Sequence, residues 1–218
     1  MKRIELKQHA RETLRKHRGK GILGLVIPMV VVGLVMGLLI ALIAIEEFVG
    51  FVFLLYFVAI IAAVPINVGI FYFYRRLTNE GDAAEYGDLL KGHTDNFPRN
   101  LGRLVQMQIF INLWMILLIV PGIIKAFSYA MTPYILGDDD IKKDATSPSP
   151  ITISRLMMDG HKMDLFVLIL SFIGWFILGA ITFNILTILF VAPYFHLTLA
   201  RFYETLKADL DPQYLTSS

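Results

Sequence analysis

The residues best placed to do chemistry in this sequence are a histidine flanked by two aspartates, His161 with Asp159 and Asp164. Imidazole and carboxylate groups are common metal ligands. On a helix, however, Asp159 and His161 stand two positions apart and do not share a face. We therefore interpret Gly160-His161 as a structural motif, with an interfacial histidine at a helix C-terminus, and we predict no metal and no cofactor.

Sequence motifs for catalysis are missing. The sequence contains no HExxH, no GxSxG, no phosphate-binding P-loop and no GxGxxG before a helix. It also contains no cysteine, which excludes disulfides and thiolate chemistry. We therefore predict that the chain is not an enzyme.

A second group of chemically capable residues lies inside long apolar segments. Amides and hydroxyls in hydrocarbon need hydrogen-bonding partners, and two explanations stay open. These side chains form hydrogen bonds between helices, or they line a polar cavity for a lipid headgroup or peptide. The candidates for ligand contact are Asn67, Asn112, Lys125, Ser128, Ser171, Trp175, Asn184 and His196. His196 follows Pro193 by three residues, where a proline frees a backbone carbonyl.

The elements that must position these residues are membrane helices. Apolar runs without charge fill 21–45, 48–74, 104–124 with 126–137, and 165–200. Because a crossing needs about 20 apolar residues, the sequence predicts an all-α, polytopic membrane protein with six transmembrane helices in three hairpins. The predicted domain spans 21–206, with hairpins over about 21–74, 104–137 and 165–203.

The middle hairpin is the least regular of the three. Residues 104–137 are interrupted by Pro121-Gly122, which we take as a structural motif of the turn, and by Lys125. We expect a tight hairpin with Lys125 at its outer turn. A re-entrant pair is the alternative, and it would place Lys125 deeper in the membrane as a candidate functional group.

Charge fixes the predicted orientation. The sequence has 20 Lys and Arg, and in the six-crossing topology all except Lys125 fall on one side. Short cytoplasmic loops are enriched in these residues, so the termini and both long loops are expected in the cytoplasm. Residues 1–20 predict a basic interfacial helix, and 207–218 form a cytoplasmic tail. Anionic lipid headgroups, worth about 1 kcal/mol per base, explain this helix better than nucleic acid does.

Further cytoplasmic interfacial helices are expected around Tyr86 and over about 152–161. With the first helix they suggest a three-fold internal repeat. Each unit would have an interfacial helix, a histidine near its end, and a hairpin whose second helix contains proline. The histidines are His17, His93 and His161, and the prolines are Pro65, Pro133 and Pro193.

Several ordered blocks resemble a known family. They are LIVPGIIK at 118–125, SY at 128–129, PYIL at 133–136, MMDGHK at 157–162, LSFIGW at 170–175, Ala192-Pro193-Tyr194 and ARFYE at 200–204. Together they resemble a bacterial integral-membrane family catalogued as domain of unknown function 975. The family often has glycine at the turn before its last helix, where this chain has Asn184. Asparagine also tolerates left-handed backbone, so we expect that turn to survive.

The resemblance implies residence in the bacterial inner membrane and assigns no activity. Combined with the basic cytoplasmic face, it favours a non-enzymatic, multi-pass protein that binds membrane lipids or a partner membrane protein, including a second copy of itself. The alternative is a small transporter or channel with a polar-lined cavity inside the membrane. We expect no nucleic-acid partner.

Overall fold

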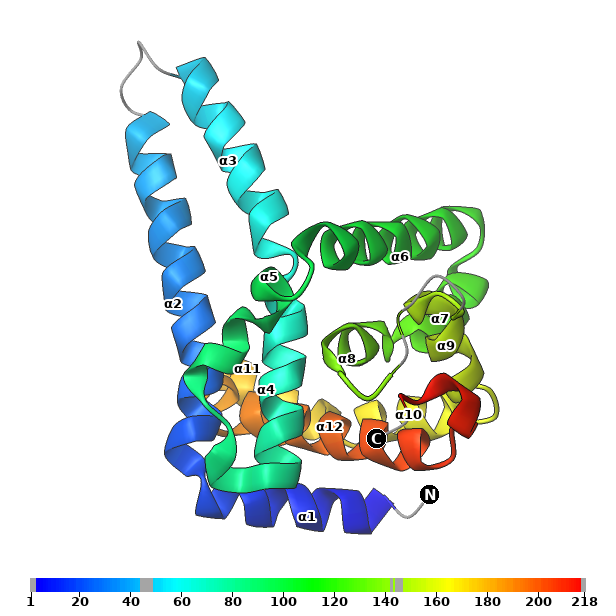
Figure 1. Cartoon of the computed structure of the whole chain (residues 1–218). Helices are drawn as coiled ribbons and strands as arrows, with labels where there is room; N and C mark the ends of the chain where they lie inside the picture. Colours follow the sequence, from blue (N-terminus) through cyan, green and yellow to red (C-terminus); the bar gives the residue numbers. More distant parts are fainter. Residues whose placement is uncertain (1–2, 44–48, 142, 144–146, 217–218) are drawn as a thin grey trace.

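The computed structural model describes residues 3–43, 49–141, 143 and 147–216 (Figure 1). These residues are almost entirely helical, and the only extended pairing among them is an isolated bridge between Ile141 and Leu215. The predicted all-α class is therefore confirmed. The α-helices are α1 Arg3–Lys16, α2 Arg18–Ile43, α3 Val49–Ala63, α4 Ile66–Glu80, α5 Lys91–Thr94, α6 Phe97–Leu117, α7 Ile119–Tyr129, α8 Thr132–Gly137, α9 Pro150–Met157, α10 Lys162–Leu170, α11 Ile173–Ile181 and α12 Ala192–Ala208. Short 3₁₀ helices are η2 Gly81–Ala83, η3 Tyr86–Leu90 and η5 Pro212–Tyr214, and η4 Thr187–Val191 is a π-helix.

Four segments of the described chain are long and apolar enough to cross a membrane: Arg18–Leu42, Val52–Ala83, Ile119–Gly137 and Lys162–Ile181. In three of them most of the apolar residues face outward, whereas half of the Ile119–Gly137 window is buried. In the first segment only 11% of the most apolar window is buried inside the protein. In water such a surface would aggregate, whereas in a bilayer it is the expected lipid contact. The length and composition of these four segments suggest a membrane protein.

The structure supports four of the six predicted crossings, and six crossings stay a prediction. The helix that falls short is α6, in which Arg103 and the amides of Gln106, Gln108 and Asn112 lower the mean hydropathy. In Figure 1, α2 and α3 project together from the rest, while α6 lies crosswise to them. The second half of the last apolar run is divided between η4 and α12.

The middle hairpin turns earlier than the sequence suggested. Its bend is at Leu118, which has extended backbone (φ −155°, ψ 124°) between α6 and α7. Pro121 and Gly122 lie inside the first turns of α7, where a proline removes no bond that the helix needs. Placing Lys125 at the outer turn was therefore wrong, since it lies within α7. Gly122 lets the two helices approach, because a Cβ there would lie 2.4 Å from Met115 Sδ.

A helix is present in the predicted N-terminal region as α1, which ends at Lys16, and α2 begins at Arg18; the place of α1 at the membrane interface stays a prediction. α1 buries Leu6, Ala10 and Leu14 and packs along α12, and most of its charged residues are exposed, whereas Lys7 is half-buried. The helices expected around Tyr86 and 152–161 are η3 with α5, and α9 over Pro150–Met157.

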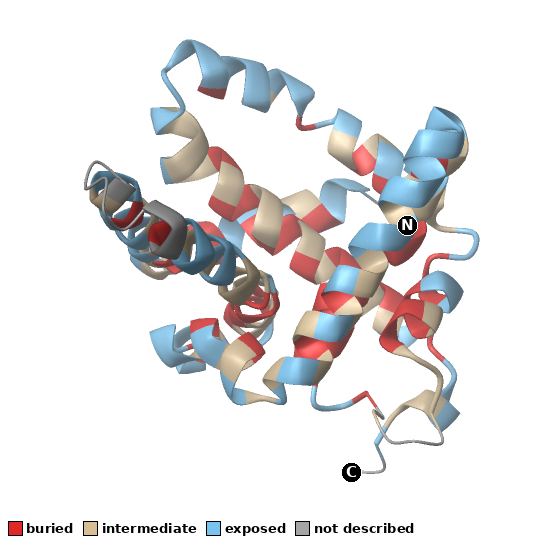
Figure 2. Ribbon diagram, turned by 90° about the horizontal axis from the view of Figure 1, so that it is seen from above, coloured by how far each residue is buried: buried red, intermediate tan, exposed pale blue. Residues whose placement is uncertain are grey.

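The buried core lies where three helices that begin at prolines meet. Pro65 precedes α4, and Pro133 and Pro193 lie in the first turns of α8 and α12. The repeat hypothesis placed each proline inside a helix. Turn residues separate the helices at Pro65 and before Pro133, because proline cannot donate the backbone bond that continuation needs. At Pro193 the π-helix η4 runs directly into α12, so this proline lies inside a continuous helical segment as predicted. α4 contacts both α8 and α12, and most of the largest fully buried side chains come from these helices. In Figure 2 the buried residues, in red, lie mainly where helices pack together.

Candidate functional site

A cleft that contains two of the predicted ligand residues lies between α4 and α6, with Pro133 of α8 also in its wall. It has a volume of about 540 Å³. Its lining is mostly apolar, and it contains three amides and no charged side chain. The lining residues are Val64, Asn67, Phe71, Leu104, Val105, Met107, Gln108, Ile109, Asn112 and Pro133. We call it the amide groove. Two predicted ligand residues, Asn67 and Asn112, thus meet there although they are 45 positions apart in the sequence (112 − 67).

The amides of this groove are only partly used within the protein. The Asn67 Nδ2 group donates to the Val64 carbonyl oxygen at 3.0 Å, and the same oxygen also accepts from the Asn67 backbone N–H at 3.3 Å. Gln108 Nε2 donates to Asn112 Oδ1 at 3.2 Å. Asn67 Oδ1 and Asn112 Nδ2 therefore have no protein partner among the described residues. An acceptor and a donor remain available to a ligand in an otherwise apolar groove, which is the usual composition of a small-molecule site.

The two predicted serines have local structural roles. Ser128 Oγ donates to the Ile124 carbonyl at 2.8 Å, and its own carbonyl accepts from Ser154 Oγ at 2.9 Å, which ties α7 to α9. Ser171 Oγ donates to the Leu168 carbonyl one turn earlier in its helix. Such back-bonding is common for serine in apolar helices. Neither serine is part of the amide groove.

Lys125 and His196 are not among the residues that line the amide groove. The Lys125 ammonium lies 5.2 Å from the centroid of the Trp114 ring, a cation–π contact between α7 and α6. His196 stacks on Tyr74, with ring centroids 5.0 Å apart, and also contacts Phe71. Its Nδ1 is buried without a partner, so the suspicion that His196 is unusual is consistent with its surroundings. Tyr194, after Pro193, is fully buried against Phe172.

Asn184 and His161 shape turns. Asn184 has φ 63° and follows Phe183 at φ 51°, so the left-handed turn expected before the last helix is confirmed. Gly160 has φ 78° and joins α9 to α10. His161 precedes α10, with Nδ1 3.1 Å from Asp164 Oδ2. Its predicted place at a helix C-terminus was wrong, because α9 already ends at Met157 and the left-handed glycine intervenes.

Trp175 borders a second groove, between the N-terminal helices and α11. Its ring packs against Phe190 with centroids 5.5 Å apart. The same groove, of about 660 Å³, is lined by Arg11, Leu14, Arg15 and Arg18.

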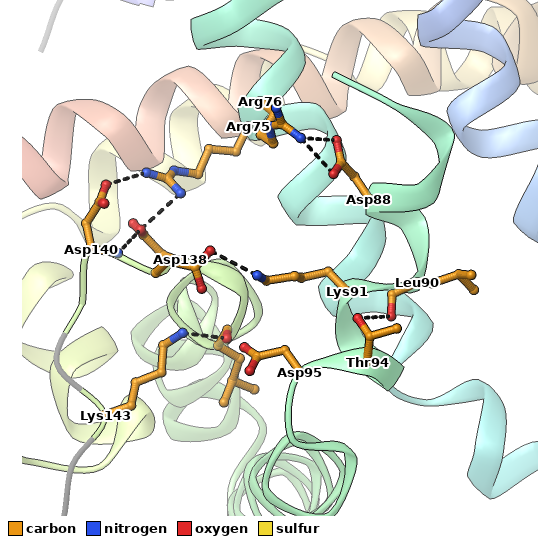
Figure 3. A network of polar contacts seen from close by, with 12 residues as sticks. Arg75, Arg76, Asp88, Leu90, Lys91, Thr94, Asp95, Asp138, Asp140 and Lys143 are labelled. Carbon is orange, nitrogen blue, oxygen red and sulfur yellow. Dashed lines mark hydrogen bonds and ion pairs between the residues drawn. The ribbon is translucent and has the colours of Figure 1, made fainter. Parts of the chain in front are cut away.

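The most connected polar cluster was not among the predicted site residues. Asp138, fully buried, accepts from Arg75 Nη1 at 3.0 Å, Lys207 Nζ at 2.8 Å and Tyr203 Oη at 2.7 Å. Arg75 also pairs with Asp140 at 3.0 Å and with Glu204. Figure 3 shows Arg75 reaching Asp138 and Asp140 from α4. We call these six residues the ion cluster, and it joins the ends of α4, α8 and α12.

Smaller polar contacts surround this cluster (Figure 3). Arg76 binds Asp88 at 2.8 Å, and Lys91 binds Asp139 at 2.9 Å. Lys143 Nζ donates to the Leu136 carbonyl at 2.9 Å near the end of α8. Burial, and then the charge of Arg99, lower the pKa of Lys143. The only sequence signal for the cluster was the run Asp138-Asp139-Asp140 directly after an apolar segment.

Comparison with known proteins gives one match. A family model described as "Protein of unknown function (DUF975)" matches residues 28–209. No curated protein matches the chain, and no solved structure does.

Proposed function

The chain belongs to the family described as Protein of unknown function (DUF975), and from that membership and its geometry we propose that it is a non-enzymatic bacterial inner-membrane protein that binds a membrane lipid. The amide groove carries this proposal. Its apolar walls suit an acyl chain, and the free Asn67 Oδ1 and Asn112 Nδ2 suit the hydroxyl and ester groups next to a headgroup. The groove lies against the Val52–Ala83 segment, so hydrocarbon is the solvent from which a ligand would enter.

The ion cluster supports the six-crossing topology by parity. Arg75, Asp138 and Lys207 are in direct contact, so they lie on one side of the membrane. The chain must then cross an even number of times between residues 75 and 138, and again between 138 and 207. Ile119–Gly137 and Lys162–Ile181 cannot each be a lone crossing. Either each of these two segments is paired with a second crossing, which α6 and the segment after Asn184 would provide, or the segment does not cross the membrane.

Cysteine accessibility tests this topology, because the chain has no native cysteine. Single cysteines would replace Asp139 in the cytoplasmic loop, Leu118 at the α6–α7 bend, and Phe183, which is 90% exposed. We expect Leu118→Cys and Phe183→Cys to react with an impermeant maleimide in intact cells, and Asp139→Cys to react only after permeabilisation. Labelling of Asp139→Cys from outside would refute the orientation. If Leu118→Cys is labelled only after permeabilisation, α6 and α7 do not cross the membrane.

Lipid binding is tested by native mass spectrometry of the protein extracted in mild detergent. We expect a retained lipid in the wild type and at least tenfold less in Asn112→Leu, since a leucine offers the lipid no donor (about 1.4 kcal/mol per tenfold change). Gln106→Leu is the matched control, because Gln106 is an amide of the same helix that does not line the groove. A wild type with no lipid, or equal loss in both variants, would refute the proposal. A second protein chain in place of lipid would favour a partner membrane protein or a homo-oligomer.

Transport is the second candidate, and the break between α3 and α4 favours it. Interrupted membrane helices often carry the substrate sites of transporters, and Asn67 lies two residues after the break at Pro65. Liposome flux separates the two functions. A transporter should move solute at a rate that falls in Asn67→Leu, while a lipid-binding protein should show no flux in either form.

A further inference from the structure

The groove that Trp175 borders is a different kind of site from the amide groove. Four cations of the N-terminal segment stand at spacings of four, four and three: Lys7, Arg11, Arg15 and Arg18. Spacings of four keep Lys7, Arg11 and Arg15 on one face of α1, and Arg18, the first residue of α2, lines the same groove as Arg11 and Arg15. We call this set the basic stripe. Among the described residues no carboxylate pairs with any of its members.

Aromatic rings oppose the stripe along its length. The Lys7 ammonium lies 4.4 Å from the centroid of Phe172 and also donates to the Ser171 carbonyl at 3.2 Å. The Arg11 guanidinium lies 5.5 Å from the centroid of Tyr194. Trp175 and Phe190 line the groove beside Arg11, Arg15 and Arg18. Each cation–π contact contributes about 0.5–1 kcal/mol, so rings hold this end of the stripe in place without neutralising it.

The cations of the stripe repel one another. Burial lowers the pKa of Lys7, and the charges of Arg11 and Arg3 lower it further. Arginine binds phosphate oxygens through two parallel hydrogen bonds and is less strongly hydrated than lysine. Three guanidinium groups around one groove of about 660 Å³ therefore match a phosphate group in charge and in donor geometry.

The surroundings of the groove indicate where the phosphate comes from. α11, which supplies Trp175, belongs to the Lys162–Ile181 segment and exposes Ile173, Ile177 and Ile181. α1 lies on the predicted cytoplasmic surface. A site between a basic surface helix and a lipid-facing helix can hold a headgroup phosphate while acyl chains extend along α11. A soluble phosphate would gain nothing from the aromatic and apolar side of the groove.

We propose that the groove between the basic stripe and the Trp175–Phe190 pair is a binding site for the phosphate of an acidic phospholipid, separate from the amide groove. This second proposal depends on the cytoplasmic orientation of α1, and it does not require a lipid in the amide groove. The two sites are lined by different residues, so each can fail alone.

The test uses the full chain in nanodiscs and reads Trp175 by fluorescence quenching. The sequence has two tryptophans, so Trp114→Phe leaves Trp175 as the sole reporter. We expect phosphatidylglycerol with brominated acyl chains, present as a minority lipid in a phosphatidylcholine bilayer, to quench Trp175 far more than the same fraction of brominated phosphatidylcholine. The double variant Arg11→Gln/Arg15→Gln should abolish that preference. Two bases near the surface correspond to a change in lipid affinity of about tenfold or more.

The matched control is Arg3→Gln with Lys16→Gln, which removes the same charge from the same helix but leaves the groove intact. Circular dichroism shows whether each variant keeps its helices. Equal loss of preference in both double variants would overturn the proposal, because it would reduce the effect to general surface charge. Displacement of phosphatidylglycerol by inorganic phosphate would also overturn it in favour of a soluble ligand, and so would equal quenching by both lipids.

Discussion

Neutralising Asp138 is the sharpest test of how the fold is held together. Asp138→Asn keeps the shape of the side chain and one acceptor oxygen but removes the negative charge between Arg75 and Lys207. Asp138 is 0% exposed and also accepts from Tyr203 Oη and from the backbone N–H of Asp140, at 2.9 Å. Removing one partner of a buried ion pair typically costs about 3–5 kcal/mol.

The remaining partners reduce that cost. Arg75 retains Glu204 and Asp140, and Lys207 retains Asp140. We therefore expect the lower end of the range, a loss of about 3 kcal/mol in the free energy of unfolding. The neighbouring Asp139 provides the control, because its side chain is 57% exposed and, among the described residues, forms an ion pair with Lys91 alone. Asp139→Asn should cost no more than about 1 kcal/mol.

The assay is reversible unfolding in mixed micelles, with increasing denaturing detergent and helicity as the signal. Wild type, Asp138→Asn and Asp139→Asn are compared at the same pH and micelle composition. Combining Asp138→Asn with Arg75→Gln should cost less than the sum of the two single changes, because the residues share one interaction. Equal midpoints for the two aspartate variants, or strict additivity with Arg75→Gln, would show that the ion cluster does not stabilise the fold as argued.

Two further outcomes follow from the geometry. Gly69→Ala would place a Cβ 1.8 Å from the Leu89 carbonyl oxygen and should destabilise the protein by about 1–3 kcal/mol, whereas Gly33→Ala, with nothing within 4 Å, should stay within about 1 kcal/mol in the same unfolding assay. The hydrogen bond from Lys207, with help from nearby charges and against partial burial, lowers the pKa of Asp140 from 3.8. Its stabilising contribution is therefore complete above the unfolded-state pKa and is lost as pH falls through the lower folded-state value. In unfolding midpoints measured from neutral to acid pH, the gap between wild type and Asp140→Asn should close at the acid end, and a gap that widens would contradict this sign.

The sequence contained enough information for the class of fold and for several local features. Long apolar runs separated by charged loops predict membrane helices whatever their packing. In hydrocarbon, the backbone N–H and C=O groups must form hydrogen bonds with each other, as they do in a helix. The turn at Asn184 was also predictable, since its short polar side chain tolerates the left-handed backbone that the structure shows. Asn67 and Asn112 could be selected as polar residues in apolar runs, but nothing local showed that they face one groove.

The errors arose where a residue has two possible structural meanings. Pro121 was taken as a helix breaker, yet a proline in the first turn of a helix is compatible with it, and the bend at Leu118 has no breaker residue at all. His161 was assigned to a helix end because its neighbours are polar, yet Gly160 separates it from α9. In both cases helix ends depend on packing that a single sequence does not contain.

The ion cluster could not be found from sequence because its members are far apart along the chain. Arg75 and Asp138 are separated by 63 positions (138 − 75), and each lies in a loop-like polar context where a solvated charge is the usual interpretation. Hydrophobic periodicity gives helices and their faces, but it carries no information on which distant charge meets which. Only the packing of α4 against α12 and α8 brings these residues together.

That packing gives the repeat hypothesis a structural form. In each unit a proline lies at or just before the first turn of a helix, and the interfacial helix of the following unit packs on that helix: η3 and α5 on α4, α9 on α8, and α1 on α12. The last of these contacts joins the two ends of the chain and closes a ring. Each unit contributes charge to the ion cluster, so the cluster and the α1–α12 contact stabilise the same closed arrangement. The basic stripe belongs to the helix that completes the ring, which places the proposed phosphate site at the seam between the first and third units.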